Sequence, residues 1–494
     1  MKRPILILFF LLALLGSALW WLANDRNEIE RGKGSLLVHC AAGLRRPMSE
    51  IARQYEEEFG IKIILQFGGS GALESQLMVA GGDLYLPADQ GYVESVRSKG
   101  LIKESMPVAQ LSAGIVVPKG NPKGIASLKD LAREGVKISL GEKSASVGKF
   151  TWGVLAKEGL LGEVELNVVV TKPTVNMIVE DVATGAVDAA IAWDAVAKNF
   201  PEVEWIPVPE FTKRSKLAGI GVLTSSKDAS RALHFARYVT SRERGRKVFV
   251  EMGFEVPDVG DAWLDIPEVT LFSGSMLRPA IQERIRGFEK REGCRVNTVF
   301  EGCGTLIGMM KAGSQPAGYF SCDVKFLDMV DDRFFPGTVM TGNEIILLVA
   351  KGNPKSLSTL ADLSGAGVKL GVCDEQKSAL GQLTHEMLTR RKVEFENIAV
   401  KVAKGDDLVS AMQARSLDAA LVYRSNALAS PVTLKECEIV DLNDELAFAE
   451  QPYAVARETA HPELMKRLGE SLSSDDARSD FEKLGFTWKL EEEE

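Results

Sequence analysis

Residues 118–122 read Pro-Lys-Gly-Asn-Pro, and residues 350–354 read Ala-Lys-Gly-Asn-Pro, about 232 positions later. Nearly the same spacing relates residues 67–71 to residues 300–304, and residues 253–255 to residues 485–487. Solenoid repeats are only about 20–50 residues long, so a spacing of this size means two copies of a domain-sized unit. The sequence therefore predicts a chain built by duplicating a complete fold.

The duplication sets the expected domain boundaries. We expect a first domain at residues 35–257 and a second at residues 268–488, joined by a short connector. Residues 1–34 form an apolar segment and a polar linker ahead of them. The chain has 494 residues, of which 45% are apolar and 26% charged, a composition typical of folded globular domains.

Each copy alternates short apolar stretches with amphipathic ones. Residues 36–38 and 61–67 read as strands, while residues 48–59 and 72–79 carry apolar side chains at helical spacing. The second copy repeats this order over residues 269–310. The alternation implies an α/β fold with parallel sheets and right-handed crossovers. About 220 residues per copy is large for one sheet, which favours two lobes in each domain.

Charge and histidine content narrow the function classes. The net charge is −9 and no arginine-rich stripe is present, so we expect no nucleic-acid partner. A small anion remains possible as a ligand, because backbone dipoles bind anions against the overall sign of the charge. Four histidines without ligand-like spacing predict no histidine-based metal site, and we expect no cofactor.

Residues 5–23 form an uncharged apolar segment that follows Lys2 and Arg3. As a helix this segment would be about 28 Å long, close to the thickness of the hydrocarbon core of a bilayer. Trp20 and Trp21 lie where an interfacial aromatic belt belongs, and the basic start places the rest of the chain outside the cytoplasm. We expect an uncleaved anchor in the inner membrane, with a cleaved signal peptide as the alternative.

The turns expected after the strands are rich in glycine, serine and alanine. In the first copy they are residues 40–44, 67–71 and 141–148. Ligands of open parallel sheets bind at the carboxyl ends of the strands, where helix N-termini present free N–H groups. The alternative is that these residues only make tight turns and cap helices. Matching turns in both copies favour a binding site.

These stretches resemble the periplasmic molybdate-binding proteins of ABC importers, a group of two-lobed solute-binding proteins. The resemblance rests on Ala41–Leu44, Phe67–Gly71, Ala88–Gln90, Val116–Pro122 and Asp188–Asp194. It implies two tandem type II periplasmic-binding-protein-like domains, each of two lobes, after an N-terminal transmembrane helix. It also implies a periplasmic location, a small oxyanion such as molybdate or tungstate as ligand, and an importer permease as partner.

The resemblance implies one set of oxyanion contacts in each copy. These are Gly43, Ser70, Val147, Val175 and Trp193 in the first copy, and Ser275, Cys303, Leu380, Gly405 and Tyr423 in the second. The first copy departs from the family pattern at Gly43, where the family has serine, and at Trp193, where it usually has tyrosine. The second copy keeps Ser275 and Tyr423 but has Cys303 where the family has serine, and a thiol is a weaker donor than a hydroxyl.

Five of the six cysteines lie in the second copy. Cys294 and Cys303 flank an expected strand, so they are too far apart to form a disulfide. Cys303, Cys322 and Cys373 are expected at strand ends that face the second cleft. One interpretation is a soft-metal or thiol-reactive site. The other is that cysteine simply replaces small residues, with one disulfide outside the cytoplasm.

The expected function is delivery of an oxyanion to an importer by closure of two lobes around it. The alternative is a sensor or scaffold in which one or both clefts have diverged. An enzyme is not expected, because neither a Ser-His-Asp order nor an HExxH or Walker motif is present. Glu74, Asp83 and Asp89 lie near the expected cleft, but such carboxylates are more often helix caps or solvated surface residues.

Overall fold

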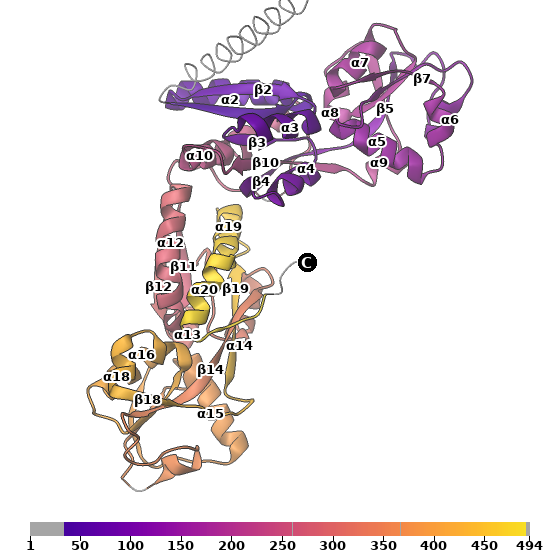
Figure 1. Ribbon diagram of the computed structural model, residues 1–494. Helices are drawn as coiled ribbons and strands as arrows, with labels where there is room; N and C mark the ends of the chain where they lie inside the picture. Colours follow the sequence, from indigo (N-terminus) through magenta and orange to yellow (C-terminus); the bar gives the residue numbers. More distant parts are fainter. Residues whose placement is uncertain (1–33, 259, 366, 491–494) are drawn as a thin grey trace, which may run out of the picture. The chain divides into compact units, whose positions relative to one another are not determined.

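The computed structural model describes residues 34–258, 260–365 and 367–490, and the chain divides into two compact units on either side of Trp263 (Figure 1). We refer to these units as the first and second domains. The membrane segment expected at residues 5–23 lies outside the described residues. Among the described residues, no helix has both the length and the apolar character needed to cross a membrane.

The first domain contains two separate five-stranded sheets, and the sheet that contains β1 defines the first lobe of this domain. The strands of this sheet lie in the order β2-β1-β3-β10-β4. The elements of the lobe are β1 (Ser35–Ala41), η1 (Ala42–Leu44), α2 (Arg45–Phe59), β2 (Lys62–Gly68), α3 (Ser70–Ala80), β3 (Leu84–Leu86), α4 (Gln90–Arg97), β4 (Ile102–Leu111), β10 (Lys216–Leu223), α10 (Ala229–Thr240) and α11 (Gly245–Glu251).

The second sheet, in the order β7-β6-β8-β5-β9, defines the second lobe of the first domain. Its elements are β5 (Ala113–Pro118), η2 (Leu128–Ala132), β6 (Ile138–Gly141), α5 (Ser146–Lys157), α6 (Leu161–Glu165), β7 (Val168–Lys172), α7 (Val175–Ala183), β8 (Ala189–Trp193), α8 (Asp194–Ala197), β9 (Val203–Pro207) and α9 (Pro209–Thr212). All residues of β8 and all but the last of β5 are buried. Strands covered on both faces read as continuous apolar runs, which explains their lack of alternation.

The sheets are mixed rather than parallel, which corrects the expectation from the strand–helix alternation. β1 pairs with β2 and β3 in parallel, but β10 is antiparallel to both β3 and β4. Likewise, β6 pairs in parallel with β7 and β8, whereas β5 is antiparallel to β8 and β9. The antiparallel strands are those that carry the chain from one lobe to the other and back, so no crossover helix fixes their direction.

The second domain repeats this arrangement with one difference. Its elements are β11 (Glu268–Gly274), η3 (Ser275–Leu277), α12 (Arg278–Glu292), β12 (Arg295–Glu301), α13 (Cys303–Lys311), β13 (Gly318–Phe320), α14 (Val324–Asp328), η4 (Asp331–Arg333), β14 (Thr338–Ala350), η5 (Ala361–Ser364), β15 (Leu370–Cys373), α15 (Ala379–Arg391), β16 (Ile398–Val402), α16 (Gly405–Gln413), β17 (Ala419–Tyr423), α17 (Arg424–Leu428), α18 (Pro431–Glu436), β18 (Cys437–Val440), β19 (Phe448–Val455), α19 (Pro462–Leu472), α20 (Asp475–Lys483) and β20 (Thr487–Trp488).

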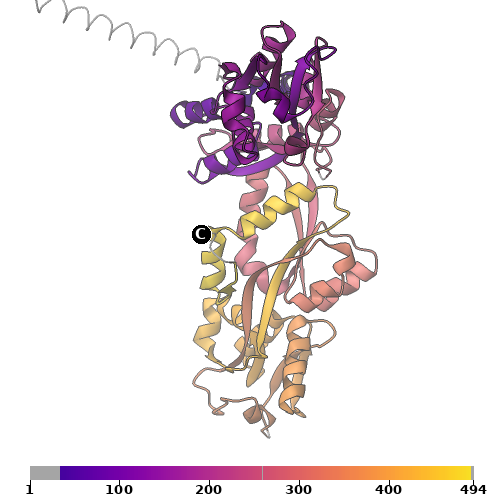
Figure 2. The same ribbon diagram turned by 90° about the vertical axis from the view of Figure 1, so that its right-hand side faces the viewer.

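The difference is that one long strand, β14, replaces the β4–β5 pair of the first domain (Figure 2). β14 pairs with β19 as far as Glu344 and with β17 from Ile345 onward. Both lobes of the second domain therefore share a single ten-stranded sheet. The first lobe holds the elements around β11 and β19, and the second lobe holds those around β15 and β17.

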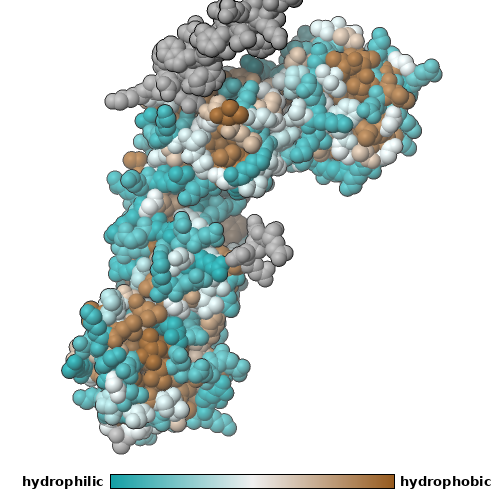
Figure 3. Space-filling model, in the orientation of Figure 1, coloured by the Kyte–Doolittle hydropathy of each residue, from teal (hydrophilic) through white to brown (hydrophobic). Residues whose placement is uncertain are grey.

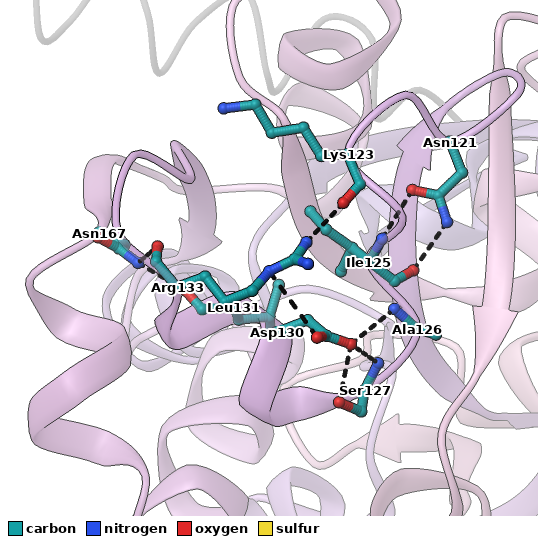
Figure 4. A network of polar contacts seen from close by, with 9 residues as sticks. All are labelled: Asn121, Lys123, Ile125, Ala126, Ser127, Asp130, Leu131, Arg133 and Asn167. Atoms are coloured by element: carbon teal, nitrogen blue, oxygen red, sulfur yellow. Dashed lines mark hydrogen bonds and ion pairs between the residues drawn. The ribbon is translucent and has the colours of Figure 1, made fainter.

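The repeated Lys-Gly-Asn-Pro stretch forms the same turn in both domains. Asn121, at φ 44°, donates from Nδ2 to the carbonyl of Ile125, and its Oδ1 accepts from the Ile125 N–H, both at 2.9 Å (Figure 4). Asn353, at φ 41°, makes the same two 2.9 Å bonds to Leu357. Asparagine tolerates a left-handed backbone and bonds locally to nearby main chain, so this part of the repeat is structural rather than functional.

The visible surface is mainly hydrophilic and carries scattered apolar patches (Figure 3). Exposed large apolar side chains include Val79 near the end of α3, Leu166 after α6, and Val432 in α18. Such scattered exposure is normal for folded domains, because polar atoms are too few to cover the whole surface.

Candidate functional site

The first domain has a small cavity at the carboxyl ends of strands from both lobes. Every residue that lines it ends a strand or lies in the turn or first helical residues after one. From the first lobe these are Ala41, Ala42, Gly43, Gly68, Gly69, Ser70 and Ala88; from the second lobe they are Ala145, Ser146, Val147, Pro173, Thr174, Val175 and Trp193. The cavity therefore lies between the lobes, at the edge where open α/β sheets bind ligands.

All five residues predicted for the first copy line this one cavity. They are Gly43, Ser70, Val147, Val175 and Trp193. The structure brings them together from positions up to 150 residues apart in the sequence. Val147 and Val175 lie within the first two residues of their helices, so main-chain N–H groups rather than their side chains are the polar groups they offer.

Three helices begin at the cavity, which gives it a positive electrostatic character. The helices are α3, α5 and α7, with 11, 12 and 9 residues. Their N-cap residues, Gly69, Ala145 and Thr174, make no side-chain capping hydrogen bond. The first N–H groups of a helix have no intrahelical partner, and together they act as about half a positive charge at each N-terminus. None of the lining residues, all within the described part of the chain, is charged.

Two serine hydroxyls add polar groups to this wall. The Ser70 Oγ, on a side chain that is 1% exposed, accepts the Ala88 N–H at 3.2 Å, which leaves its own hydrogen free to donate. The Ser146 Oγ is buried and has no hydrogen-bond partner among the described residues. A buried hydroxyl without a partner costs roughly 1–3 kcal/mol, so an acceptor in the cavity would stabilise this residue.

Trp193, which lines the cavity, belongs to an aromatic pair. Trp193 is 1% exposed and stacks on Phe150 with ring centroids 5.7 Å apart. The ammonium of Lys216 lies 5.4 Å from the centre of the Phe150 ring and pairs with Asp89 at 3.0 Å. This cation is therefore neutralised beside the cavity rather than in it.

The two lobes are closed on the cavity. The Gly71 N–H in α3 donates to the Ser144 carbonyl of the other lobe at 3.0 Å, and the Tyr92 hydroxyl donates to the same oxygen at 3.3 Å. The cavity is small, with a volume of about 20 Å³. This volume suits a small compact ion better than a sugar or a peptide.

The carboxylates near this cleft have structural roles. Asp89 caps α4 by accepting the Gly91 N–H at 2.9 Å. Asp83 accepts the Leu37 N–H at 2.8 Å, and Glu74 pairs with Lys99 at 2.6 Å. These contacts agree with the expectation that such groups are caps and surface partners.

In the second domain, four of the five predicted residues occupy equivalent helix starts and strand ends. Cys303 is the first residue of α13, as Ser70 is of α3; Leu380 is the second of α15, as Val147 is of α5. Gly405 starts α16 as Val175 starts α7, and Tyr423 ends β17 as Trp193 ends β8. A Cβ atom built at Gly405 would lie 3.2 Å from a methyl group of Leu380, so these two residues are neighbours.

Ser275 needs a correction, because it does not occupy the place of Gly43. Ser275 is the first residue of η3, as Ala42 is the first of η1, so the buried side chain of Met276 stands where the first domain has Gly43. β1 and β11 correspond at a spacing of 233 residues, which pairs Ala42 with Ser275 and Gly43 with Met276, so the assignment from the resemblance lay one residue too early. The second domain therefore has an apolar side chain, not a hydroxyl, at this position.

Two cysteine sulfur atoms lie in the second domain where the first domain has Ser70 and Ala88, at the start of α13 and just after β13. The Sγ atoms of Cys303 and Cys322 lie 2.6 Å apart, and the Cys322 N–H donates to the Cys303 Sγ at 3.1 Å. Burial raises the pKa of the Tyr423 hydroxyl well above its usual value, and that hydroxyl has no partner among the described residues. Burial also raises the pKa of the Cys373 thiol to about 12.

The two lobes of the second domain are joined by contacts of the same kind as in the first domain. The Thr305 N–H in α13 donates to the Lys377 carbonyl of the other lobe at 3.3 Å, and Lys404 pairs with Glu301 at 3.1 Å. In the described part of the chain, no group of three or more histidine, cysteine, aspartate or glutamate side chains is placed to hold a metal ion.

Sequence reasoning placed Cys303 and Cys322 at strand ends facing the same cleft but did not identify Ser146 or the direct contact between the two sulfurs. Ser146 directly precedes Val147 in a run of small residues, a signal that marks the turn but not which hydroxyl faces inward. The contact between the cysteines joins residues 19 positions apart on different elements, and no local pattern encodes it.

Comparison with known proteins supports the duplication. A family model described as bacterial extracellular solute-binding protein matches twice, over residues 36–255 and 269–487. A binding protein of Haemophilus influenzae is 29% identical over 222 residues, covering 44% of this chain and 90% of the relative. The molybdate-binding protein ModA of Mycobacterium tuberculosis is 28% identical over 231 residues, covering 46% and 87%. An ABC transporter substrate-binding lipoprotein of Bacillus subtilis, YvgL, is 28% identical over 230 residues, covering 44% and 86%.

Proposed function

The chain belongs to the bacterial extracellular solute-binding proteins, and we propose that its first domain binds a small tetrahedral oxyanion, such as molybdate or tungstate, for an ABC importer. The observation that carries the proposal is the set of three uncapped helix N-termini around one small, uncharged cavity. Relatives whose names include molybdate binding support the choice of ligand.

The geometry favours binding of an anion by hydrogen-bond donors alone, without a positively charged side chain. Main-chain N–H groups of α3, α5 and α7 and the hydroxyls of Ser70 and Ser146 are the donors on offer. Hydrogen bonds to a charged group contribute about 1.5–3 kcal/mol each, so several together bind an anion without lysine or arginine. Because the donors are fixed and the cavity is small, the size and protonation of the anion would decide which one binds.

Binding and release require motion of the two lobes. The closed state is held by contacts such as Gly71–Ser144, and an anion that bridges both lobes would favour that state over the open one. The closed form is then the one that the importer permease would recognise.

Calorimetric titration of the full chain with molybdate, tungstate and sulfate tests the proposal. We expect heat from at least one of them and a saturation stoichiometry near one per chain. Ser70→Ala and Ser146→Ala should each weaken binding by roughly 10-fold or more, since each removes a hydrogen bond to a charged group. Ser98→Ala, at the exposed residue that follows α4, is the matched control. Absence of heat with all three anions would reject an oxyanion as ligand.

The second candidate function is a sensor or scaffold in which the second domain has lost oxyanion binding. It is favoured by Met276 and Cys303, which replace small or hydroxyl-bearing residues in the second cleft. A stoichiometry of two per chain, or an affinity that changes on Ser275→Ala, would argue against this divergence.

The proposal places the chain outside the cytoplasm, held by residues 5–23 as an uncleaved anchor. The mass of the chain isolated from membranes tests this, because removal of a signal peptide would shorten it by about 20 residues.

A further inference from the structure

We propose that Cys303 and Cys322 are a modification site, at which a disulfide forms between the start of α13 and the turn after β13 in the second domain. Their sulfur atoms lie 2.6 Å apart, and a disulfide bond is about 2.05 Å long, so the two sulfurs need to approach by only about half an ångström. Both side chains are buried, at 0% and 5% exposure, and the structure holds all six cysteines as thiols.

The two cysteines are a coupled replacement of one contact in the first domain. There, the Ser70 Oγ accepts the Ala88 N–H at 3.2 Å; here, the Cys303 Sγ accepts the Cys322 N–H at 3.1 Å. Ser70 and Cys303 each begin the helix after the second strand, and Ala88 and Cys322 each lie two residues past the third strand. Two neighbouring positions have therefore both become cysteine in one copy.

A third position makes room for the sulfurs. Gly274 ends β11 as Ala41 ends β1, and a Cβ atom at Gly274 would collide with the Cys322 Sγ. Glycine here admits a pair of sulfur atoms that alanine would exclude. Simple replacement of small residues by cysteine would not require this additional change.

The surroundings of Cys303 suit it to be the attacking sulfur. It is the first residue of the nine-residue helix α13, and its sulfur accepts a hydrogen bond from the Cys322 N–H at 3.1 Å. Donors of this kind and a helix N-terminus stabilise a thiolate. In agreement, hydrogen bonds from Cys322 and Tyr319 lower the pKa of the Cys303 thiol against the opposing effect of burial.

The oxidant would be a disulfide, which compartments outside the cytoplasm supply. The Cys303 thiolate attacks one sulfur of that disulfide and displaces the other as a thiolate. Cys322 then loses its proton and its sulfur attacks the Cys303 sulfur, releasing the second thiolate of the oxidant. The protein loses two protons and two electrons, and the oxidant becomes two thiols. Because both sulfurs are buried, the reaction takes place when the two lobes are apart or while the chain folds.

The consequence is that the oxidised second cleft has no thiol hydrogen to donate where the first domain has Ser70. The inference concerns the second domain and does not depend on which anion the first domain binds. It depends only on a location outside the cytoplasm.

Counting free thiols in the full chain tests the inference. The chain is exported in a bacterial host, and its free thiols are alkylated with N-ethylmaleimide in denaturant, with and without prior reduction. Mass spectrometry then gives the number of labelled cysteines. We expect four labelled cysteines without reduction, six after it, and a peptide pair linked through Cys303 and Cys322. Six labels before reduction, both in the exported chain and after treatment with oxidised glutathione, would overturn the proposal, as would a link between other cysteines.

Variants distinguish a specific pair from general oxidation. Cys303→Ser and Cys322→Ala restore the first-domain residues, and each should free one thiol, so that five labels enter without reduction. Cys437→Ser, at a buried cysteine of β18, is the matched control and should leave three labels and the same link. Reduction should lower the unfolding midpoint of the wild-type chain by roughly 5–10 °C and that of the Cys303→Ser/Cys322→Ala chain hardly at all. An equal shift in both chains would contradict a stabilising Cys303–Cys322 bond.

Discussion

Replacing Gly71 by alanine should hold the first domain open without harming its fold. Gly71 lies in the first turn of α3, where its N–H bonds to the Ser144 carbonyl of the other lobe at 3.0 Å. A Cβ atom at this position would lie 2.6 Å from that carbonyl oxygen. Gly71 is not one of the glycines with a positive φ, so alanine suits the helix itself.

The magnitude follows from the clash. A Cβ atom does not approach a backbone oxygen to 2.6 Å, and here the oxygen belongs to a turn rather than to a flexible side chain. Overpacking of this kind costs about 1–3 kcal/mol, and it affects only the closed state because the contact lies between the lobes. The affinity of a ligand that binds the closed state falls by the same free energy, which is about 5–150-fold.

The assay combines titration with small-angle scattering. With molybdate as the probe, we expect the Gly71→Ala chain to bind more weakly than the wild-type chain. At the molybdate concentration that half-saturates the wild-type chain, we also expect the Gly71→Ala chain to have the larger radius of gyration. Gly153→Ala, in α5, is the control, since a Cβ atom there would meet no other atom within 4 Å. Wild-type affinity and wild-type compaction in Gly71→Ala would refute the claim that this contact belongs to the ligand-bound closed state.

Three further predictions concern stability. The side chains of Glu292 and Arg467 are both 2% exposed, and their shortest N–O distance is 2.7 Å. Glu292→Gln should therefore lower the free energy of unfolding by about 3–5 kcal/mol in chemical denaturation, because it leaves Arg467 buried opposite a neutral group. A cost below 1 kcal/mol would contradict this reasoning. Asn353→Ala should destabilise the second domain and Asn121→Ala the first, each by about 2–3 kcal/mol from two lost hydrogen bonds and an unfavourable left-handed alanine; domain-resolved hydrogen exchange should show the two effects separately. The pKa of Asp362 is lowered to about 2, first by the hydrogen bond from the Ser358 main chain. A lowered folded pKa contributes stability above the unfolded pKa, near 3.9, that is lost as the pH falls through 2. The protection factors of the amides in this turn, which correct hydrogen exchange for its intrinsic pH dependence, should therefore fall between pH 4 and 2 in wild type but not in Asp362→Asn.

Local sequence patterns predict much of the first lobe correctly. The helical spacing of residues 48–59 lies within α2, Arg45–Phe59, and its face at Met48, Ile51 and Tyr55 is buried. The strand read at residues 61–67 is β2, Lys62–Gly68. These agreements follow because helix and strand periodicity depend on residues close together in the chain. The repeated Lys-Gly-Asn-Pro stretch also specifies its structure locally, since each copy forms the same asparagine turn.

Strand direction and pairing were not predictable in the same way. The alternation of strands and helices describes β1, β2 and β3 correctly, but β4 and β10 link the lobes and run antiparallel. Their direction depends on where the chain returns after a whole lobe has formed. That information lies in packing between distant segments and not in a local pattern.

By itself the sequence determined the duplication, the alternating α/β elements and the small-residue turns at the ends of the strands, because each of these is a property of neighbouring residues. Only the tertiary structure decided that three helices start at one cavity, that Ser146 faces it without a partner, and that Met276 rather than Ser275 replaces Gly43. It also decided that Cys303 touches Cys322. These facts depend on how lobes close and elements pack, and packing acts between residues that the sequence keeps far apart.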